Sequence, residues 1–281
     1  MSADRAIFTR DLHFGFQDVK NHNWHSGDPL KTTYCDALSP LFPEGERFFI
    51  RSVKHYADRV EDPQLKDDIR QFCVQEAFHT REHEAYNKNL ASYGYDIEKM
   101  EARVKRTLSS VKSPLKKLAI TVAIEHLTAT LSHMILKDPS LLANSTPVYR
   151  NLWTWHALEE YEHKGVAYDV YLLATKHLSP WKRYVFRTSV LFVVTLKIHQ
   201  ILITNFVEML RHRKEPMGIK MWAKSVWMLF CTPGYYRRVF YYYLKFYMPF
   251  FHPLKGDDGE LVRQGRERLD AMLNSEIPDA G

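Results

Sequence analysis

Two Glu-x-x-His motifs, widely separated along the chain, limit its fold more than any other feature. Glu76 and His79 form the first motif, and Glu160 and His163 form the second. Residues three positions apart lie about 60° apart around an α-helix, so each motif directs a carboxylate and an imidazole to the same side. One such motif is common on exposed helices, but two on different helices predict a shared polar site where those helices meet.

Helix starts are marked by a repeated pair of residues. A Ser, Thr or Asp side chain can cap the first backbone amides of a helix, and a proline that follows it needs no amide partner there. Such pairs occur at Ser39-Pro40, Asp62-Pro63, Ser113-Pro114, Thr146-Pro147 and Ser179-Pro180. Between them apolar residues recur every three or four positions, which predicts helices over 44–60, 64–93, 99–111, 114–136, 147–175 and 181–211. No stretch alternates like the strands of a sheet, so the predicted class is all-α.

The composition is that of a folded protein, with 45% hydrophobic and 26% charged residues, which excludes a disordered chain. For 281 residues we expect one bundle with a sizeable appendage. The expected parts are an N-terminal arm (1–40), a metal-binding four-helix core (41–178), a basic aromatic helical extension packed on that core (179–253) and a polar C-terminal tail (254–281).

Two further carboxylates extend the pattern of the motifs. Glu46 lies on the helix predicted over 44–60, and Glu125 lies in the apolar run AIEHL of another predicted helix. One Glu from each of two helices, with one Glu-x-x-His from each of two others, is the ligand set of ferritin-like di-metal bundles. We therefore predict a ferritin-like four-helix bundle with a di-metal site and additional C-terminal helices. The alternative, that these glutamates face solvent, is hard to reconcile with the apolar surroundings of Glu125.

The charges and the ligand types indicate which metals the site would hold. Two divalent ions carry four positive charges, which four carboxylates balance, so the cluster can be buried without an unpaired charge. Carboxylate and imidazole suit iron, manganese or zinc, whereas the absence of thiolates argues against a structural zinc site. The expected cofactor is two Fe ions, with Mn or Zn as alternatives. The expected ligands are Glu46, Glu76, His79, Glu125, Glu160 and His163.

Three blocks of the sequence resemble one bacterial family. The family is called predicted metal-dependent hydrolases and is related to the ferritin-like di-iron proteins. The resemblance extends over roughly residues 14–251 and implies a metal-binding helical protein. It rests on the segments PLFPEGERFF (40–49), FCVQEAFHTREHEAYN (72–87) and WHALEEYEHKGVAYDVY (155–171).

A third histidine is a candidate ligand. His156 lies four positions before Glu160, about 40° away on the helix, so His156, Glu160 and His163 share one face. This series is similar to the arrangement in the p-aminobenzoate N-oxygenase family, where a third histidine joins the usual two. The alternative is that His156 makes a hydrogen bond inside the core beside Trp153 and Trp155.

Two other residues are expected beside the ligands and not among them. His83 lies on the metal-facing stripe one turn after His79, and Glu159 directly precedes Glu160. An acidic residue in the latter position can hold the N–H of a ligand imidazole from another helix, although a solvated glutamate paired with a lysine is an equal alternative. Structural or surface roles are expected for His126, His133 and Glu162.

The segment from Lys176 to Pro253 differs from the rest of the chain. It contains thirteen Lys or Arg against only Glu208 and Glu215, and 18 of the 38 aromatic residues. Basic and aromatic residues together are typical of contact with nucleic acid or with a lipid surface. Because the charges here are interleaved with apolar residues, we expect peripheral membrane contact and no nucleic-acid binding. The alternative is that these residues only pack on the bundle.

The longest apolar stretch, 185–210, approaches the length of a membrane span. Arg187, Lys197 and other polar residues interrupt it, so we expect a buried or surface-lying helix. The N-terminus lacks the apolar run of a signal peptide, and the cysteines are scattered and odd in number (Cys35, Cys73 and Cys231). The expected location is therefore the cytoplasm, with peripheral contact at the inner face of the membrane.

The leading functional hypothesis from the sequence is a non-haem di-iron enzyme that activates O₂ to oxidise a small, apolar substrate. No Rossmann or phosphate-binding motif is visible, so electrons would come from a partner protein or from the substrate itself. The first alternative is a metal-dependent hydrolase that uses a metal-activated hydroxide. The second is a non-enzymatic, iron-handling ferritin-like protein. No feature of the sequence predicts an oligomeric state.

Overall fold

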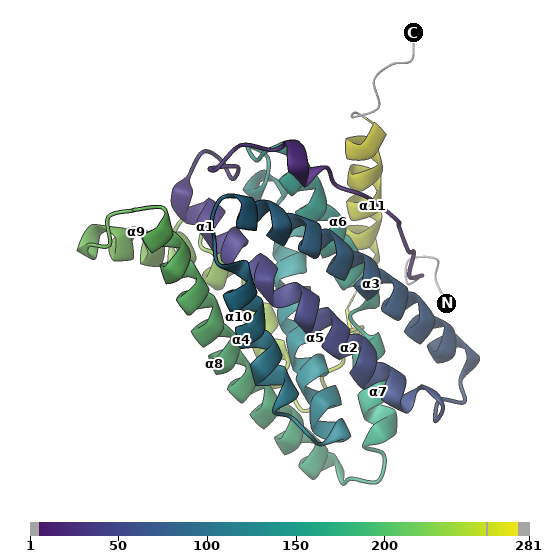
Figure 1. Cartoon of the computed structure of the whole chain (residues 1–281). Coiled ribbons are helices and arrows are strands. Elements are labelled where there is room, and N and C mark those ends of the chain that lie inside the picture. The colour runs from purple at the N-terminus through teal and green to yellow at the C-terminus, as the bar shows by residue number, and fades with distance from the viewer. Residues whose placement is uncertain (1–5, 257, 275–281) are drawn as a thin grey trace.

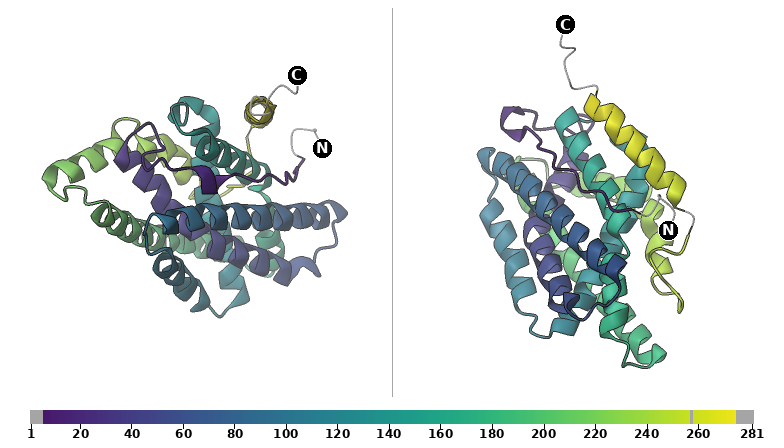
Figure 2. Two further views of the ribbon diagram at one scale, coloured as in Figure 1. Left: turned by 45° about the horizontal axis from the view of Figure 1, so that its top comes forward. Right: turned by 90° about the vertical axis from the view of Figure 1, so that its right-hand side faces the viewer.

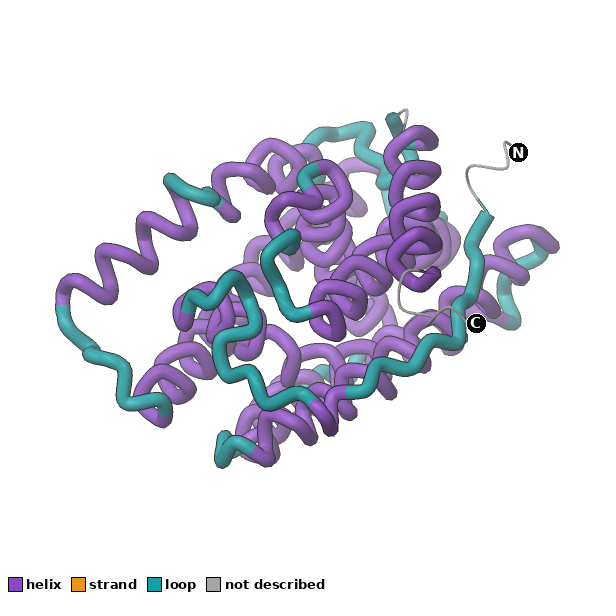
Figure 3. Tube along the Cα trace, turned by 90° about the horizontal axis from the view of Figure 1, so that it is seen from above, coloured by secondary structure: helices purple, strands orange, loops and turns teal. Residues whose placement is uncertain are grey.

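The computed structural model describes residues 6–256 and 258–274, and within these ranges the chain forms helices joined by loops (Figures 1 and 3). The predicted all-α class is confirmed. Short 3₁₀ helices lie at Phe16–Asp18, Ser39–Leu41 and Pro139–Leu141. The α-helices of the described residues are α1 (Pro29–Leu38), α2 (Phe42–Ala57), α3 (Pro63–Ser92), α4 (Ile97–Ser109), α5 (Pro114–Lys137), α6 (Pro147–His163), α7 (Val166–Ala174), α8 (Pro180–His212), α9 (Ile219–Phe230), α10 (Tyr235–Lys245) and α11 (Gly259–Asn274).

Four of these helices form the bundle that holds the predicted ligands. Helices α2 and α3 pack along each other as one pair, and α5 and α6 pack as the other (Figure 1). Helix α5 is the central element, because it also contacts α2, α7, α8, α10 and α11. Its sequence is apolar around most of its circumference, as expected of a helix surrounded by other helices.

Most of the predicted helix caps are present. The side chains of Asp62, Ser113 and Ser179 each accept a hydrogen bond from a backbone amide in the first turn of their helix. Ser39 differs, because α2 begins only at Phe42 and the Ser39 hydroxyl points into the core. Thr146 does not cap α6 through its side chain either. Both helices therefore begin with a proline in the first turn but without a side-chain cap.

The arm predicted over 1–40 is not wholly irregular, because it contains α1, which Asp28 caps through two backbone amides. The extended segment before α1 runs across the bundle between α3 and α6 (Figure 2). There the backbone amides of Arg10 and Phe14 donate to Glu159 and Glu82. The arm therefore covers the outer side of both helices that carry a Glu-x-x-His motif.

The single helix predicted over 147–175 is broken into α6 and α7 at Gly165. A Cβ atom at this glycine would lie 2.8 Å from the Leu254 side chain, so the chain from residue 254 can pack against the break only because no side chain is present. The segment predicted as a polar tail from 254 forms α11, which packs on α6 and α5. Residues 275–281 of that segment lie outside the described residues.

Helices α5 and α8 are each long and apolar enough to cross a membrane. For α5 the most apolar 18-residue window is 72% buried within the structure, which identifies it as the core helix of the bundle. For α8 the corresponding value is 39%. Its inner face packs on α1 and α5, while large apolar side chains such as Phe192 and Leu196 are exposed on its outer face.

His25 joins the arm to the body of the protein and provides a test of this packing. Its ring is 2% exposed and lies within hydrogen-bond distance of Ser145 and Tyr235. Burial, aided by the positive charge of Lys31, lowers the pKa of His25 to about 4. The imidazole is therefore neutral in the folded protein at pH values where the unfolded chain takes up a proton.

We expect acid to weaken this packing. Because the folded pKa is below the unfolded value of about 6.5, the contribution of His25 is full above pH 6.5 and is lost as the pH falls toward 4. The loss amounts to about 3 kcal/mol of unfolding free energy. In urea titrations of metal-free protein between pH 7.5 and 4.5, His25→Gln should remove this part of the pH dependence, and the exposed His177→Gln should not. Equal pH dependence in wild type and His25→Gln would contradict the assignment.

Candidate metal centre

The predicted ligands meet inside the bundle. None is more than 3% exposed. They come from α2 (Glu46), α3 (Glu76 and His79), α5 (Glu125) and α6 (His156, Glu160 and His163). Helical spacing places the members of each motif on one face, and the packing of the four helices turns these faces toward one another.

The potential ligand atoms form three overlapping groups. Within each group they lie within 4.8 Å of one another, so one ion could reach all three atoms after small shifts. Glu76 and His79 each belong to two of the groups, and Glu76 is the member that the group of Glu125 and His163 shares with the rest of the cluster. The groups are Glu46, His79 and His156; Glu76, His79 and Glu160; and Glu76, Glu125 and His163.

The individual distances give Glu160 a similar central position. Its Oε1 atom is 3.1 Å from His156 Nε2 and 3.8 Å from His79 Nδ1. Its Oε2 atom is 3.7 Å from His163 Nε2. The same His163 nitrogen lies 3.5 Å from an oxygen of Glu76 and 3.5 Å from an oxygen of Glu125. Glu76 and Glu160 are thus the two carboxylates that face both halves of the cluster.

Several of these buried oxygens have no hydrogen-bond donor. Both oxygens of Glu76, both of Glu125 and one each of Glu46 and Glu160 are unpaired among the described residues. A buried carboxylate without donors loses its hydration and gains nothing in return, which is strongly unfavourable. A cation at the centre would satisfy these atoms together.

The orientation of His163 is fixed by Gln75. The amide nitrogen of Gln75 donates to the Phe8 carbonyl at 3.0 Å and to Glu162 at 3.3 Å. Its Oε1 atom is consequently the acceptor that faces His163 Nδ1 at 2.8 Å. His163 must therefore carry its proton on Nδ1, and the lone pair on Nε2 faces the carboxylates.

His79 is held less tightly. Its Nε2 atom lies 3.2 Å from an oxygen of Glu159, but neither atom has a hydrogen-bond partner among the described residues. The other nitrogen, Nδ1, lies 3.7 Å from an oxygen of Glu76. Arg10 in turn donates to Glu159 through its backbone amide and its guanidinium group. Burial lowers the pKa of His79 well below its usual value, so this imidazole is neutral and can act as a ligand.

A longer chain of hydrogen bonds orients His156. The Ser39 hydroxyl donates to Asn87 Oδ1 at 2.7 Å and can then only accept from His83 Nδ1 at 2.9 Å. The other nitrogen of His83 must accept from His156 Nδ1, also at 2.9 Å. His156 Nε2 is left with a lone pair that faces Glu160 Oε1 at 3.1 Å. Two lone pairs at this distance repel each other unless a cation or a proton lies between them.

The carboxylate pKa values follow from the same crowding. Burial raises the pKa of Glu46, Glu76 and Glu125 well above the usual value, and the nearby charge of Glu160 adds to the effect. Burial also disfavours the ionised form of Glu160, but a proton shared with the facing nitrogens of His156 and His163 would outweigh it and hold this pKa well below the usual value, a role that a cation would take over when those nitrogens present lone pairs. Four ionised carboxylates can coexist here only with added positive charge. The donor set and its inward lone pairs thus fit a metal cofactor.

Other residues around the cluster were missed from the sequence. Gln75, Ser39 and Asn87 orient the imidazoles, Thr80 donates to Glu46 at 2.9 Å, and Arg10 balances Glu159. The position of Gln75 directly before Glu76 was a usable signal, because it mirrors Glu159 before Glu160. The role of Arg10 could not be predicted from the sequence, because its contact with Glu159 joins residues about 150 positions apart.

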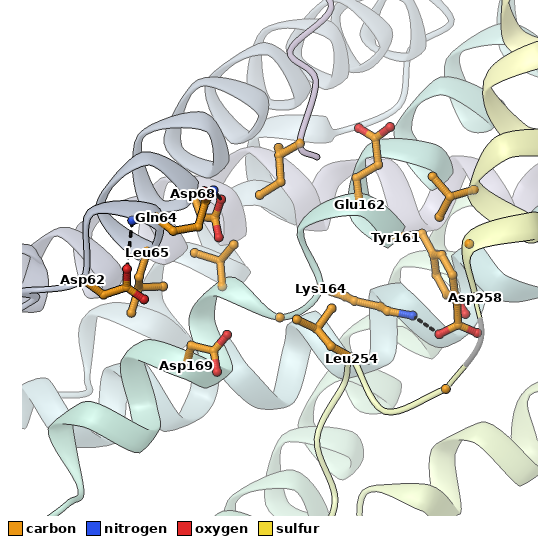
Figure 4. A pocket seen from close by; sticks show the side chains of 16 residues that line it. Asp62, Gln64, Leu65, Asp68, Tyr161, Glu162, Lys164, Asp169, Leu254 and Asp258 are labelled. Atoms are coloured by element: carbon orange, nitrogen blue, oxygen red, sulfur yellow. Dashed lines mark hydrogen bonds and ion pairs between the residues drawn. The ribbon is translucent and has the colours of Figure 1, made fainter. Parts of the chain in front are cut away.

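Two cavities lie near the cluster. An apolar cavity of about 280 Å³ adjoins α2 and α5 on the side of Gly45 and Ile124. A polar cavity of about 490 Å³ lies beyond His163, where Glu162 and Lys164 of the same chain segment line it (Figure 4). In the polar cavity, Lys164 forms an ion pair with Asp258 at 2.6 Å. Of these two cavities, the apolar one is in contact with the cluster, because Phe42 lines it and packs against His156.

The comparisons with known proteins agree with a metal-binding chain. A family model described as predicted metal-dependent hydrolase matches residues 8–257. No curated protein and no solved structure matches the chain. The matched range covers α1 to α10 and therefore includes every residue of the cluster.

This match corrects the leading hypothesis from the sequence. The expectation of a di-iron, O₂-activating oxidoreductase is wrong, because the family is one of metal-dependent hydrolases. The hydrolase alternative is the one that the match supports. The same hard nitrogen and oxygen ligands suit metals in both classes of enzyme, so the ligand set could not separate them.

Proposed function

Because the chain belongs to the family of predicted metal-dependent hydrolases, we propose that its buried cluster holds two divalent ions and hydrolyses an ester-type bond. The observation that carries the proposal is the arrangement of His156 and His163. Each of them has one nitrogen that donates outward and one lone pair that faces the carboxylates. This is the form in which histidines bind metals, with the outer partner fixing the tautomer.

The residues divide into two sets with two shared members. Glu46, His79 and His156 would hold one ion, and Glu125 and His163 would hold the other, with Glu76 and Glu160 between them. The mixed carboxylate and imidazole donors suit Mn²⁺, Fe²⁺ or Zn²⁺. Bound there, two such ions would supply Lewis acidity and lower the pKa of a water molecule.

The protein's own contribution is orientation and exclusion of bulk water. Trp155 packs edge-on against His79 at 4.8 Å between ring centroids, and Phe72 packs in the same way against His163 at 4.9 Å. Both rings keep the imidazoles from rotating and keep the site apolar around its rim. In the reaction, the water oxygen bonds to the carbonyl carbon or the phosphorus, the bond to the leaving oxygen breaks, and a proton from the water passes to that oxygen.

The test uses metal-free protein reloaded with Mn²⁺, Zn²⁺ or, without air, Fe²⁺. We expect close to two ions per chain and metal-dependent release of nitrophenolate from p-nitrophenyl acetate or from bis(p-nitrophenyl) phosphate. The metal-free protein should release none above background. Protein that binds two ions per chain and hydrolyses neither compound would contradict the proposal.

We also propose a peripheral contact with anionic membranes through the outer face of α8, α9 and α10. Large apolar side chains are exposed on all three helices, including Phe192, Trp227 and Phe240. Exposed basic residues lie among them, such as Lys224 and Arg237. Apolar side chains beside cations complement a lipid surface with anionic headgroups.

At low salt, the protein should sediment with phosphatidylglycerol vesicles and less with phosphatidylcholine vesicles. The charge reversal Lys224→Glu with Arg237→Glu should weaken vesicle binding roughly 30-fold, because each of the two basic residues near the surface contributes about 1 kcal/mol. A protein that stays in the supernatant with both vesicles, or that forms dimers through this face, would contradict the membrane contact.

A further inference from the structure

The apolar cavity beside the cluster is lined by side chains from several helices. About 280 Å³ in volume, it lies between α2, α4, α5 and α8 and is lined mainly by aliphatic and aromatic side chains. Its inner end is formed by Phe42, Gly45 and Ile124, and its mouth by the exposed Ser110, Lys116 and Lys197. Apolar voids are unfavourable, because the lining atoms lack dispersion contacts on one side. A cavity of this size is therefore expected to have an apolar occupant.

Gly45 is the residue that opens the inner end. It lies inside α2, where glycine is unfavourable relative to alanine because it loses more backbone entropy on folding. Close packing does not demand it, since the only atom within 4 Å of an added Cβ would be Phe49 Cζ at 3.8 Å, an ordinary contact. The missing side chain therefore leaves space in the cavity, directly beside Glu46.

Phe42 connects this space with the cluster. It lines the cavity, and its ring lies 4.3 Å from that of His83 and 4.7 Å from that of His156, between centroids. On α5, Ile124 lines the same cavity directly before Glu125. A molecule in the cavity would thus be separated from His156 by the ring of Phe42.

We propose that this cavity holds the apolar chain of the substrate, and that the substrate is a carboxylic ester with an unbranched acyl chain. The inference rests on the proposed hydrolase function and adds the substrate class. The acyl chain would lie between α5 and α8, with the ester carbonyl at the Phe42 end. Water adds its oxygen to the carbonyl carbon, the bond to the alkoxy oxygen breaks, and the alcohol leaves with a proton from the water.

The test compares p-nitrophenyl esters from acetate to dodecanoate on metal-loaded protein. Each methylene that enters the cavity should raise kcat/KM roughly threefold to tenfold until the cavity is full. Ile198→Phe adds bulk inside the cavity and should lower the decanoate-to-acetate ratio at least tenfold. Leu196→Phe adds the same group on the exposed face of α8, because Leu196 is 58% exposed, and should leave the ratio unchanged. Should Ile198→Phe fail to fold, Gly45→Leu tests the inner end, with Gly45→Ala as its smaller partner.

A second readout separates this inference from the proposed function. Binding of the fluorescent fatty acid 11-(dansylamino)undecanoate to metal-free protein, and its displacement by decanoate, needs no hydrolysis. We expect the probe to bind wild type and Leu196→Phe equally well and Ile198→Phe at least tenfold more weakly. This result would support binding of the apolar chain in the cavity even if no ester is cleaved. The cavity assignment would be overturned if the protein cleaved p-nitrophenyl acetate in a metal-dependent reaction, showed no preference for esters with longer chains and bound no probe. That result would still support the proposed hydrolase function.

Discussion

Replacing Glu125 with glutamine is expected to lower the affinity for one of the two ions at least 100-fold while leaving the metal-free protein no less stable than wild type. The carboxylate of Glu125 is 2% exposed, and both of its oxygens lack a donor. A neutral amide of the same shape removes one negative charge from the cluster, which weakens cation binding by about 3 kcal/mol. In the metal-free protein the same change replaces a buried carboxyl group whose ionised form is strongly disfavoured there.

Glu82→Gln provides the matched control, because Glu82 is a buried glutamate of α3 that faces the N-terminal arm. It accepts from the backbone amide of Phe14 at 2.9 Å and from Arg81 at 2.8 Å. Its replacement should destabilise the protein with or without metal, by about 2 kcal/mol, and leave both ions bound. Metal content by mass spectrometry and urea unfolding with and without metal would measure both effects. Glu125→Gln protein that keeps both ions at wild-type affinity would show that Glu125 is not a ligand.

Removal of the third imidazole is the second large effect that we expect. His156→Ala should lower the affinity for the ion shared with Glu46 and His79 at least 100-fold and leave the other ion bound. The loss follows from the lone pair that the hydrogen bonds of Ser39 and His83 direct toward Glu160. Competition with a chelator measures the affinity of each ion, and for His156→Ala we expect one tightly and one weakly bound ion per chain.

Two other histidine variants distinguish a ligand from a structural ring. His83→Ala should weaken the same ion by about 10- to 100-fold, because it removes the partner that fixes the tautomer of His156. His133→Ala removes an equally buried ring, one that bonds to Tyr161 and packs on Tyr242, and should leave both affinities unchanged. Added imidazole should restore tight binding to His156→Gly but not to His83→Ala. Two tight ions in His156→Ala would instead indicate a site with two histidines.

The sequence by itself determined the helices and which of their faces carry the candidate ligands. Both depend on local spacing: Glu76 and His79, or Glu160 and His163, lie on one side of any α-helix. The central position of Glu125 also followed from the sequence, because a carboxylate in an apolar run has no solvated face. The division of 147–175 at Gly165 did not, since its cause is the approach of Leu254 from a distant part of the chain.

Only the tertiary structure decided how the imidazoles are oriented and where a substrate could lie. The proton positions on His156 and His163 depend on His83 and Gln75, which lie on α3 and face α6 across the bundle. The apolar cavity likewise depends on the distance between α2, α5 and α8. The reaction class followed from neither pattern nor packing but from the family match, because hard nitrogen and oxygen ligands bind the metals of oxygenases and hydrolases alike. Spacing along a helix is fixed by the backbone, whereas contacts between helices exist only once the whole bundle has packed.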